Sequence, residues 1–322
     1  MNAPTGAVLQ QQKPLTGAQK FWARFRRNWM LHSMMVLPMV YYILFEALPL
    51  YGLQIAFRDY SASDGIVGSA WIGLKHYMEF FRDPDWSKMV VNTISISFYQ
   101  IGVGFPIPII LALVIHINQK TALKKLTQNV AYIPHFISVV VMIGLLHQAF
   151  HPQYGIIAAI YREFGINKTV QDIRFLKSTF RHLFVWSGVW QNMGWSTIVY
   201  VAALSGVSNE LHEAAKIDGA SRWRRVISVD LPAIMPTVSI MLIMRFGSVL
   251  SVGYEKVYLM QNNLNIEVSE VISTYVYKKG IGAGKQSFGS AIGLLNSAIN
   301  SGMVILVNKI SSWLTDGEAG LF

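Results

Sequence analysis

The chain contains no cysteine, and only 14% of its 322 residues are charged. Without cysteine there are no disulfides, no thiolate metal sites and no thiol redox chemistry. A typical soluble domain has about 25% charged residues, so the shortage of charge argues against an ordinary soluble protein. What fills the sequence instead is apolar, because 52% of the residues are hydrophobic.

Six apolar runs are long enough to cross a bilayer, since a spanning helix needs about 20 mostly apolar residues. They cover residues 31–53, 90–116, 130–150, 183–205, 233–253 and 288–310. The sequence therefore predicts an all-α membrane protein with about six transmembrane helices, rather than a large soluble helical protein. The first run is too long for a signal peptide and has no small-residue cleavage site after it, so we expect a retained helix.

The net charge of +10 is distributed as membrane topology requires, and this argues against a nucleic-acid partner. Residues 13–27 carry five Lys and Arg and no acid, and Lys120, Lys124 and Lys125 fill a short polar loop. Both segments read as cytoplasmic under the positive-inside rule, although the total over all loops does not decide the orientation. We therefore expect both termini of a multi-pass membrane protein to be cytoplasmic, with a tail at 1–30, a membrane domain at 31–310 and a tail at 311–322.

The segments predicted outside, 54–89, 151–182 and 254–287, are rich in aromatic and turn residues, so we expect them to be folded. The second run contains "GVGFPIPII", with Pro106 and Pro108. Proline removes a backbone donor, and in lipid this is tolerated only where protein or water satisfies the freed carbonyls. We expect a kink that faces either a cavity or simply a neighbouring helix.

One charged stretch, "EAAKIDGASRWRRVISVDLP" at 213–232, lies between two apolar runs. Ser208 and Ser221 are suited to cap two short helices, Gly219 permits the positive φ that ends the first, and Pro232 should stop the second. Apolar residues share one face of each helix: Leu211, Ala214 and Ala215, then Trp223, Val226 and Ile227.

The sequence therefore predicts a loop at 206–232 that consists of two amphipathic helices with a bend, at the cytoplasmic surface. Its cations, such as Lys216 and Arg222, would suit lipid contact, whereas its acids, such as Glu210 and Asp218, favour docking to a protein. The residues alone leave both roles open.

The stretch resembles the EAA loop of binding-protein-dependent ABC importer permeases: EAA, three residues, Gly, nine residues, Ile, any residue, Leu-Pro. Val229 stands where the family usually has Ile. "LPLYGLQIAFRDYS", "WIGLKHYMEFF", "FPIPIILAL" and "YIPHFIS" are similar to carbohydrate-importer permeases, in a subgroup for complex, often uronate-containing oligosaccharides that includes permeases of alginate importers.

The resemblance implies a type I importer permease that pairs with a second homologous permease. Two cytoplasmic ATPase subunits would supply ATP and Mg, and an extracytoplasmic solute-binding protein would deliver the oligosaccharide. It also implies an ATPase-coupling role for Glu213, Ala214, Ala215, Asp218, Gly219, Trp223, Leu231 and Pro232. The chain itself should hold no cofactor, because "KGIGAGKQ" has Lys279 and Gln286 where a P-loop needs Gly and Ser or Thr.

Charges inside the apolar runs cost several kcal/mol unless they are solvated or paired. Arg245 lies in the fifth run and Glu46 in the first. They could form a structural pair, or Arg245 could face a water-filled cavity and meet a substrate carboxylate. Glu46 could instead relay protons.

Polar and aromatic side chains within the runs suit a sugar pathway, although each could equally serve as an interhelical contact. With Arg245, the candidates are Trp190, Gln191, Asn192, Trp195, Tyr99, Gln100, Asn296 and Asn300. His147 and His151 lack a third ligand nearby, so we expect no metal site.

The sequence thus predicts a transport subunit, not an enzyme, that moves an oligosaccharide by alternating access. The alternative is a proton- or ion-coupled sugar carrier that uses Glu46. A membrane-bound enzyme has no catalytic constellation to support it.

Overall fold

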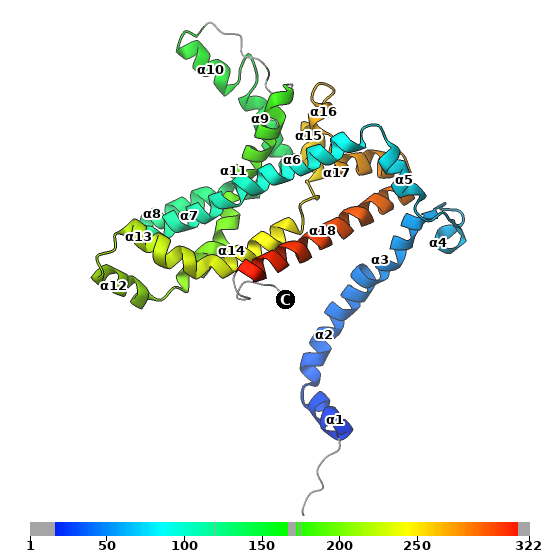
Figure 1. Cartoon of the computed structure of the whole chain (residues 1–322), viewed down its shortest axis with the longest axis horizontal. Helices are drawn as coiled ribbons and strands as arrows, with labels where there is room; N and C mark the ends of the chain where they lie inside the picture. The colour runs from blue at the N-terminus through cyan, green and yellow to red at the C-terminus, as the bar shows by residue number, and fades with distance from the viewer. Residues whose placement is uncertain (1–16, 119, 167–171, 173, 175, 315–322) are drawn as a thin grey trace, which may run out of the picture. The chain divides into compact units, whose positions relative to one another are not determined.

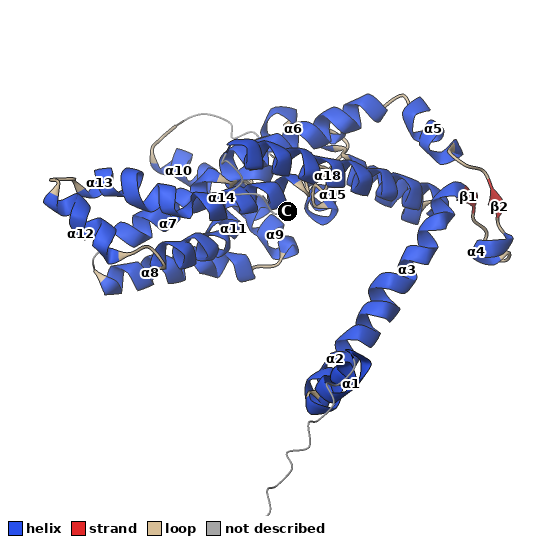
Figure 2. Cartoon of the chain, turned by 60° about the horizontal axis from the view of Figure 1, so that its bottom comes forward, coloured by secondary structure: helices blue, strands red, loops and turns tan. Residues whose placement is uncertain are grey.

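The computed structural model describes residues 17–118, 120–166, 172, 174 and 176–314. These residues are almost entirely helical, apart from one pair of two-residue strands (Figure 2). Most of the expected N-terminal and C-terminal tails lies outside them. Backbone contacts divide the chain into two units, Met1–Gln54 and Ile55–Phe322, and each is described by itself.

The first unit is helical and exposes its apolar side chains. Its elements are α1 (Gly17–Arg27), α2 (Trp29–Tyr42), η1 (Ile43–Ala47), α3 (Leu48–Leu50) and the start of η2 (Tyr51–Phe57). The run Trp29–Phe57 is long and apolar enough to span a membrane, and none of its most apolar stretch is buried inside the protein. An apolar surface of this kind suits lipid, and the run confirms the expected span at 31–53. Glu46 lies in η1, where its own unit offers no ion-pair partner among the described residues.

The second unit begins with a small folded segment. It consists of β1 (Arg58–Asp59), α4 (Gly65–Gly68), β2 (Ala70–Trp71) and α5 (Lys75–Arg82). The strands pair antiparallel, with Arg58 opposite Trp71 and Asp59 opposite Ala70. The Arg58 guanidinium donates to the carbonyls of Val67 (3.0 Å) and Ser69 (2.8 Å), which ties α4 to the strand pair.

The remaining elements form the helical body. They are α6 (Trp86–Gly104), α7 (Pro106–Ile117), α8 (Thr121–Tyr132), η3 (Ile133–Phe136), α9 (Val139–Ala149), α10 (Ile156–Glu163), α11 (Lys177–Ser205), α12 (Asn209–Ile217), α13 (Arg222–Arg225), η4 (Val226–Asp230), α14 (Leu231–Phe246), α15 (Tyr254–Met260), α16 (Ile266–Ser269), α17 (Ile272–Val276), η5 (Tyr277–Gly282) and α18 (Gln286–Leu314). Helix α11 packs against α6, α7, α8 and α14, and α14 lies beside α18 (Figure 1).

The core follows α11. Phe180, Phe184 and Val185 of this helix are buried with Ile96 of α6 and Val257 of α15. Further along α11, a second buried cluster joins it to α7 and α14; its members are Ala112, Tyr200, Leu204 and Ile234. Packing on both sides explains why α11 carries more polar residues than a lipid-facing helix.

The membrane-spanning class is confirmed. Four helical runs in the described residues are long and apolar enough to span a membrane, and a fifth is possible if the bent pair α8–η3 and α9 is one span. The fourth predicted run, 183–205, lies within α11, which has 29 residues and is therefore long enough at about 1.5 Å per residue.

Three predicted boundaries are wrong. The run 130–150 is not one straight helix, because η3 and α9 meet at a 101° bend after Phe136, where Ser138 caps α9. The polar loop at Lys120–Lys125 is mostly the helix α8. The helix that contains the fifth span extends from Arg222 to Phe246, so it ends before the predicted 253, and Arg245 lies in its last turn and not in its middle.

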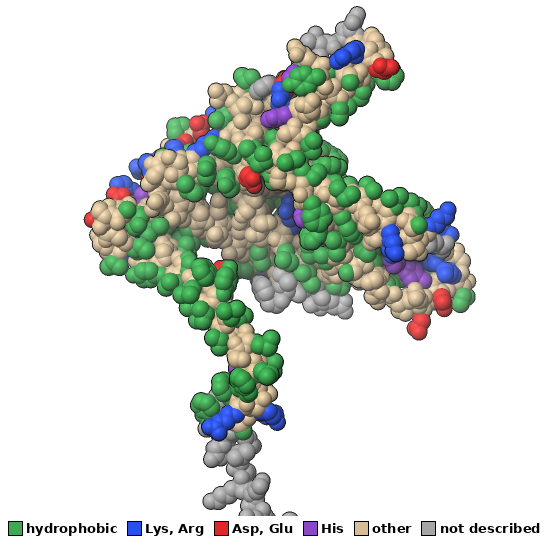
Figure 3. Space-filling model, turned by 180° about the vertical axis from the view of Figure 1, so that it is seen from behind, with side chains coloured by type: hydrophobic (Ala, Val, Ile, Leu, Met, Phe, Trp, Pro, Cys, Tyr) green, Lys and Arg blue, Asp and Glu red, His purple; other side chains and the backbone are tan. Residues whose placement is uncertain are grey.

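Charged side chains are concentrated at the ends of the helical body. In Figure 3 Lys, Arg, Asp and Glu gather where α12 and α13 lie and again at the opposite end, while hydrophobic side chains cover much of the surface between. A bilayer requires this separation, because charge is costly within the hydrocarbon layer.

Candidate functional site

A cavity with both polar and apolar walls lies between α6, α7, α11 and α14. Its volume is about 340 Å³, and Gln100, Asn192, Arg245 and Ser196 are among the residues that line it. A neighbouring cavity of about 120 Å³ shares Gln100, Arg245 and Ser248 with the first. Three of the nine predicted pathway residues, Gln100, Asn192 and Arg245, are therefore brought together on one polar surface.

The break between α6 and α7 helps to form this cavity. Helix α6 ends at Gly104, Phe105 follows, and α7 begins with Pro106 in its first turn, where a missing N–H costs little. Gly104, Phe105 and Pro108 line the cavity. The helix assignment is therefore interrupted for one residue at the predicted place, and this interruption faces a cavity.

Arg245 is the one strongly charged side chain that lines this surface. Arg245 is exposed, and it forms no ion pair with another described residue. Asn192 has its side-chain amide tied to α11 and to His135: its Nδ2 donates to the Gly188 carbonyl (3.0 Å), and its Oδ1 lies 3.1 Å from His135 Nδ1. Because no described carboxylate pairs with it, the Arg245 guanidinium remains available to an anion in the cavity.

The other predicted pathway residues lie elsewhere. Trp190 lines a separate apolar pocket, and Trp195 stacks on His135 with ring centroids 4.6 Å apart. The Tyr99 hydroxyl lies 2.8 Å from His182 Nδ1. Gln191 is buried and donates to the Ile137 carbonyl (2.7 Å).

On α18, Asn300 accepts from the Leu250 N–H (3.0 Å) and donates to the Ser251 hydroxyl (3.0 Å). These bonds satisfy the irregular backbone that follows α14, so Asn300 acts as an interhelical contact in this structure. Asn296, one turn earlier, is partly exposed.

The charged loop has the two-helix form that the sequence predicts. Ser208 caps α12 by accepting from the Glu210 N–H (3.2 Å), and Ser221 caps α13 by accepting from the Arg224 N–H (3.3 Å). Between the two helices Gly219 has φ +77°, a conformation that side chains disfavour.

Pro232 does not stop the second helix. From Arg222 the chain stays helical through η4 into α14 as far as Phe246. The element η4 is a π-helix, and this wider turn just before Pro232 accommodates a residue that has no N–H to donate. The loop is thus joined rigidly to the fifth span.

The loop exposes much of its apolar surface. Leu211, Trp223 and Ile227 are exposed as expected, whereas Val226 is buried within the protein and does not belong to the surface. Ile217, at the end of α12, is 87% exposed and was missed by the sequence reasoning. We call Leu211, Ile217, Trp223 and Ile227 the loop patch.

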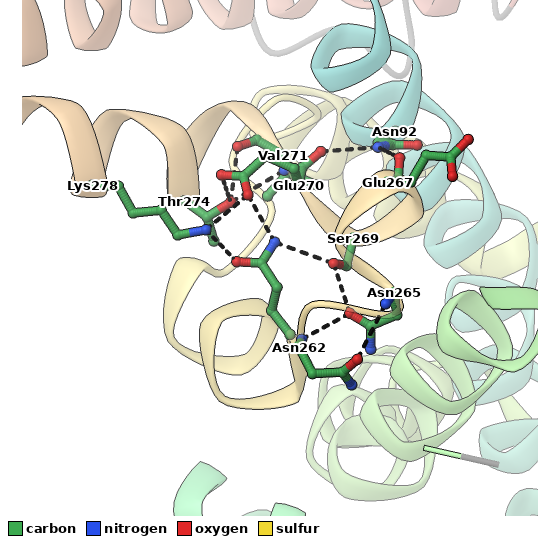
Figure 4. A network of polar contacts seen from close by, with 10 residues as sticks. Asn92, Asn262, Asn265, Glu267, Ser269, Glu270, Val271, Thr274 and Lys278 are labelled. Carbon is green, nitrogen blue, oxygen red and sulfur yellow. Dashed lines mark hydrogen bonds and ion pairs between the residues drawn. The ribbon is translucent and has the colours of Figure 1, made fainter. Parts of the chain in front are cut away.

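The segment after α14 is held by a polar network (Figure 4). Gln261 donates to Ser269 (3.1 Å) and to Glu270 (3.0 Å), and Lys278 also pairs with Glu270 (2.8 Å). Asn92 of α6 donates to the carbonyls of residues 267 and 270, which fastens the network to a membrane helix. The segment 254–287 is thus folded, as the sequence predicts.

A second polar cluster, which consists of Asp83, Tyr275 and Lys279, joins the end of α5 to α17 and η5. Tyr275 and Lys279 donate to the same Asp83 oxygen at 2.5 and 2.6 Å. Burial opposes ionisation of Asp83, but these two hydrogen bonds outweigh it and hold the pKa of Asp83 below its usual value. Burial, followed by the bond to Asp83, raises the pKa of Tyr275 to about 12.

The comparisons with known proteins agree with this arrangement. Residues 104–315 match the model of the family described as "Binding-protein-dependent transport system inner membrane component". The chain is 37% identical over 292 residues to the polygalacturonan/rhamnogalacturonan transport system permease protein YteP of Bacillus subtilis (strain 168), across 90% of this chain and 89% of that protein. It is 35% identical over 302 residues to Protein LplB of the same organism, across 93% of each.

Solved structures give the same fold. A bacterial ABC transporter for import of the acidic polysaccharide alginate matches with a TM-score of 0.83 and 30% identity, across 92% of this chain and 99% of that one. The same kind of transporter in complex with an alginate pentasaccharide-bound periplasmic protein matches with a TM-score of 0.84 and 29% identity, across 94% and 100%.

The expected resemblance to oligosaccharide and alginate importer permeases is confirmed, and the fold is that of a type I importer permease. Nothing in the comparisons supports the proton-coupled carrier. The chain belongs to the family of inner membrane components of binding-protein-dependent transport systems.

Proposed function

We propose that this subunit translocates an acidic, uronate-containing oligosaccharide, and that Arg245 meets a substrate carboxylate in the central cavity. A guanidinium is suited to this task because it stays charged and donates in a fork that matches a carboxylate. Gln100 and Asn192 would donate to hydroxyl groups beside it. The observation that carries the proposal is the position of Arg245, which is exposed, has no ion pair among the described residues and lines that cavity.

Two similarities support an acidic substrate. Alginate is named as an acidic polysaccharide in the matching structure, and a polygalacturonan is a polymer of uronic acid. A cation within a membrane helix also needs solvation or a partner, and an anionic sugar in a wet cavity provides both.

We further propose that a separate ATPase docks on the loop patch. Moving a two-state transporter from 1:99 to 99:1 needs about 5.5 kcal/mol of differential interaction. An exposed ion pair contributes roughly 0–1 kcal/mol, whereas burial of one apolar side chain contributes about 1.5–3 kcal/mol. The loop patch should therefore supply most of the docking energy, and Glu213 should set the register.

The complete assembly would contain a second homologous permease, two ATPase subunits with ATP and Mg, and a solute-binding protein. ATP closes the ATPase dimer, the rigid connection from α13 to α14 carries this movement into the fifth span, and the cavity opens outward. This mechanism requires both termini to be cytoplasmic. The excess of Lys and Arg in residues 13–27, which include no acidic residue, supports this orientation under the positive-inside rule.

Uptake by the reconstituted complex tests the substrate. Arg245→Gln should reduce kcat/KM for a uronate oligosaccharide by about tenfold or more, because a charge-assisted hydrogen bond is worth about 1.5–3 kcal/mol. Carboxyl-reduced oligosaccharide should be transported equally by both proteins. A matched variant, Arg162→Gln, changes a cation in α10 that does not line the cavity and should have no effect. An equal loss with both substrates in Arg245→Gln would contradict the proposal.

A further inference from the structure

Two histidines and an aspartate from three separate segments meet beside the loop. His116 is the second-last residue of α7, His212 lies in α12, and Asp230 is the last residue of η4. No motif or spacing in the sequence associates these three residues. Among the described residues they are the one group of three or more potential ligands whose donor atoms all lie within 4.8 Å of one another.

Burial makes this group unusual. Asp230 is only 2% exposed, and both imidazoles are largely buried. An ionised carboxylate so far from water needs a positive partner, because isolated burial costs many kcal/mol. Either a protonated imidazole or a bound cation has to supply that charge.

The distances suit a metal ion. Asp230 Oδ1 lies 3.1 Å from His212 Nε2 and 3.5 Å from His116 Nε2. A tetrahedral zinc ion binds nitrogen and oxygen at about 2.0–2.2 Å, which places neighbouring ligand atoms about 3.3–3.6 Å apart. Both separations that involve Asp230 are therefore close to what such a site requires, and the two imidazole nitrogens lie within 4.8 Å of each other.

The orientations of the Asp230 and His212 side chains also favour a bound ion over a hydrogen bond between them. Asp230 Oδ1 and His212 Nε2 are buried and have no hydrogen-bond partner, although they lie 3.1 Å apart. An N–H that pointed at the carboxylate would form such a bond. Donor atoms that are close together but do not point at one another are typical of ligands directed at a common centre.

We propose that His116, His212 and Asp230 form a binding site for a divalent transition-metal ion, with Zn²⁺ as the best-fitting ion. Two imidazoles and a carboxylate are ligands that zinc accepts, and a water molecule would complete the tetrahedron. The bound ion clips α12 to the end of α7 and to the start of the fifth span. It therefore restrains the loop and slows ATP turnover, a consequence that rests on the proposed function, whereas the binding itself does not.

Metal binding to the purified full complex in nanodiscs tests the site directly, without nucleotide. The preparation must carry no polyhistidine tag. Equilibrium dialysis with Zn²⁺ should give one ion per copy of this chain, and Co²⁺ should give the visible absorption of a tetrahedral ion. No cysteine in this chain complicates that spectrum.

Variants assign the ligands. His212→Gln and Asp230→Asn should each weaken binding by at least about tenfold, and the more peripheral His116→Gln keeps the test valid if Asp230→Asn does not fold. His151→Gln is the matched control, because His151 stacks on Tyr154 in a different part of the protein. Absence of stoichiometric binding, or binding that survives His116→Gln and His212→Gln, overturns the site.

ATPase measurements on the same complexes test the clip. Zn²⁺ should slow ATP turnover in the parent complex and leave the His116→Gln complex unchanged. If Zn²⁺ binds with the expected ligand dependence but turnover does not change, the clip is refuted and the metal site stands. A failure of ATPase docking would instead appear in both complexes without any metal, so the two proposals fail in different ways.

Discussion

Replacement of Trp223 by alanine should weaken ATPase docking more than any other single truncation in the loop patch. Trp223 is 65% exposed at the start of α13, and a tryptophan buries about 150–250 Å² in an interface. The part still exposed represents roughly 150 Å², which corresponds to about 4 kcal/mol at 25 cal/mol per Å². Ordering the side chain costs about 0.5–1.5 kcal/mol, so about 2–3 kcal/mol should be lost, or roughly 30- to 150-fold in Kd.

The assay is a titration of purified ATPase subunit against the permease pair in nanodiscs, read by light scattering or surface interferometry. Trp71→Ala is the matched control, because Trp71 is 63% exposed but belongs to β2 in the segment predicted outside. Its Kd should equal that of the parent. An unchanged Kd in Trp223→Ala, or an equal loss in both variants, would refute the assignment of docking to the loop patch.

Three further changes probe the fold and the coupling. Gly219→Val places a β-branched residue at φ +77°, which costs about 1–2 kcal/mol, and should abolish substrate-stimulated ATPase while the subunit still reaches the membrane. Asp83→Asn should lower the melting temperature by a few degrees at pH 7, because it removes the negative charge that pairs with Lys279. Since the pKa of Asp83 is lowered in the fold, its stabilisation is present at neutral pH, and the difference from the parent should shrink as the pH falls below about 4. Gly194→Val should prevent assembly, as judged by size-exclusion chromatography, because a Cβ there would lie 2.0 Å from a main-chain carbonyl oxygen of α8, whereas Gly144→Val, with no atom within 4 Å, should assemble normally.

Local rules predicted the loop well. The caps at Ser208 and Ser221 and the positive φ of Gly219 depend on a few neighbouring residues, and all three are present. The same rules failed at Pro232, because a π-helix accommodates the proline without ending the helix. They also placed Val226 on the exposed face, since helical spacing cannot tell which part of a face the rest of the protein covers.

Long-range contacts account for what the sequence did not predict. The fifth span ends at Phe246, before Gly247, and Asn300, 50 positions away, satisfies the Leu250 N–H of the irregular chain that follows. The sequence also could not distinguish residues that line the cavity, such as Arg245, from residues that make interhelical contacts, such as Gln191, because the packing of α11 decides which is which. His116 and His212 lie 96 residues apart in the sequence, and no local sequence pattern relates them.

The proposed transport mechanism requires that the loop patch is cytoplasmic and that a separate ATPase binds to it. Because the chain has no cysteine, a single Ile217→Cys variant can carry a cleavable crosslinker at its most exposed apolar position without further mutation. In inverted membrane vesicles that contain the whole complex, it should capture the ATPase subunit in high yield. Labelling of this cysteine from the periplasmic side only, or the absence of any ATPase conjugate, would contradict the account.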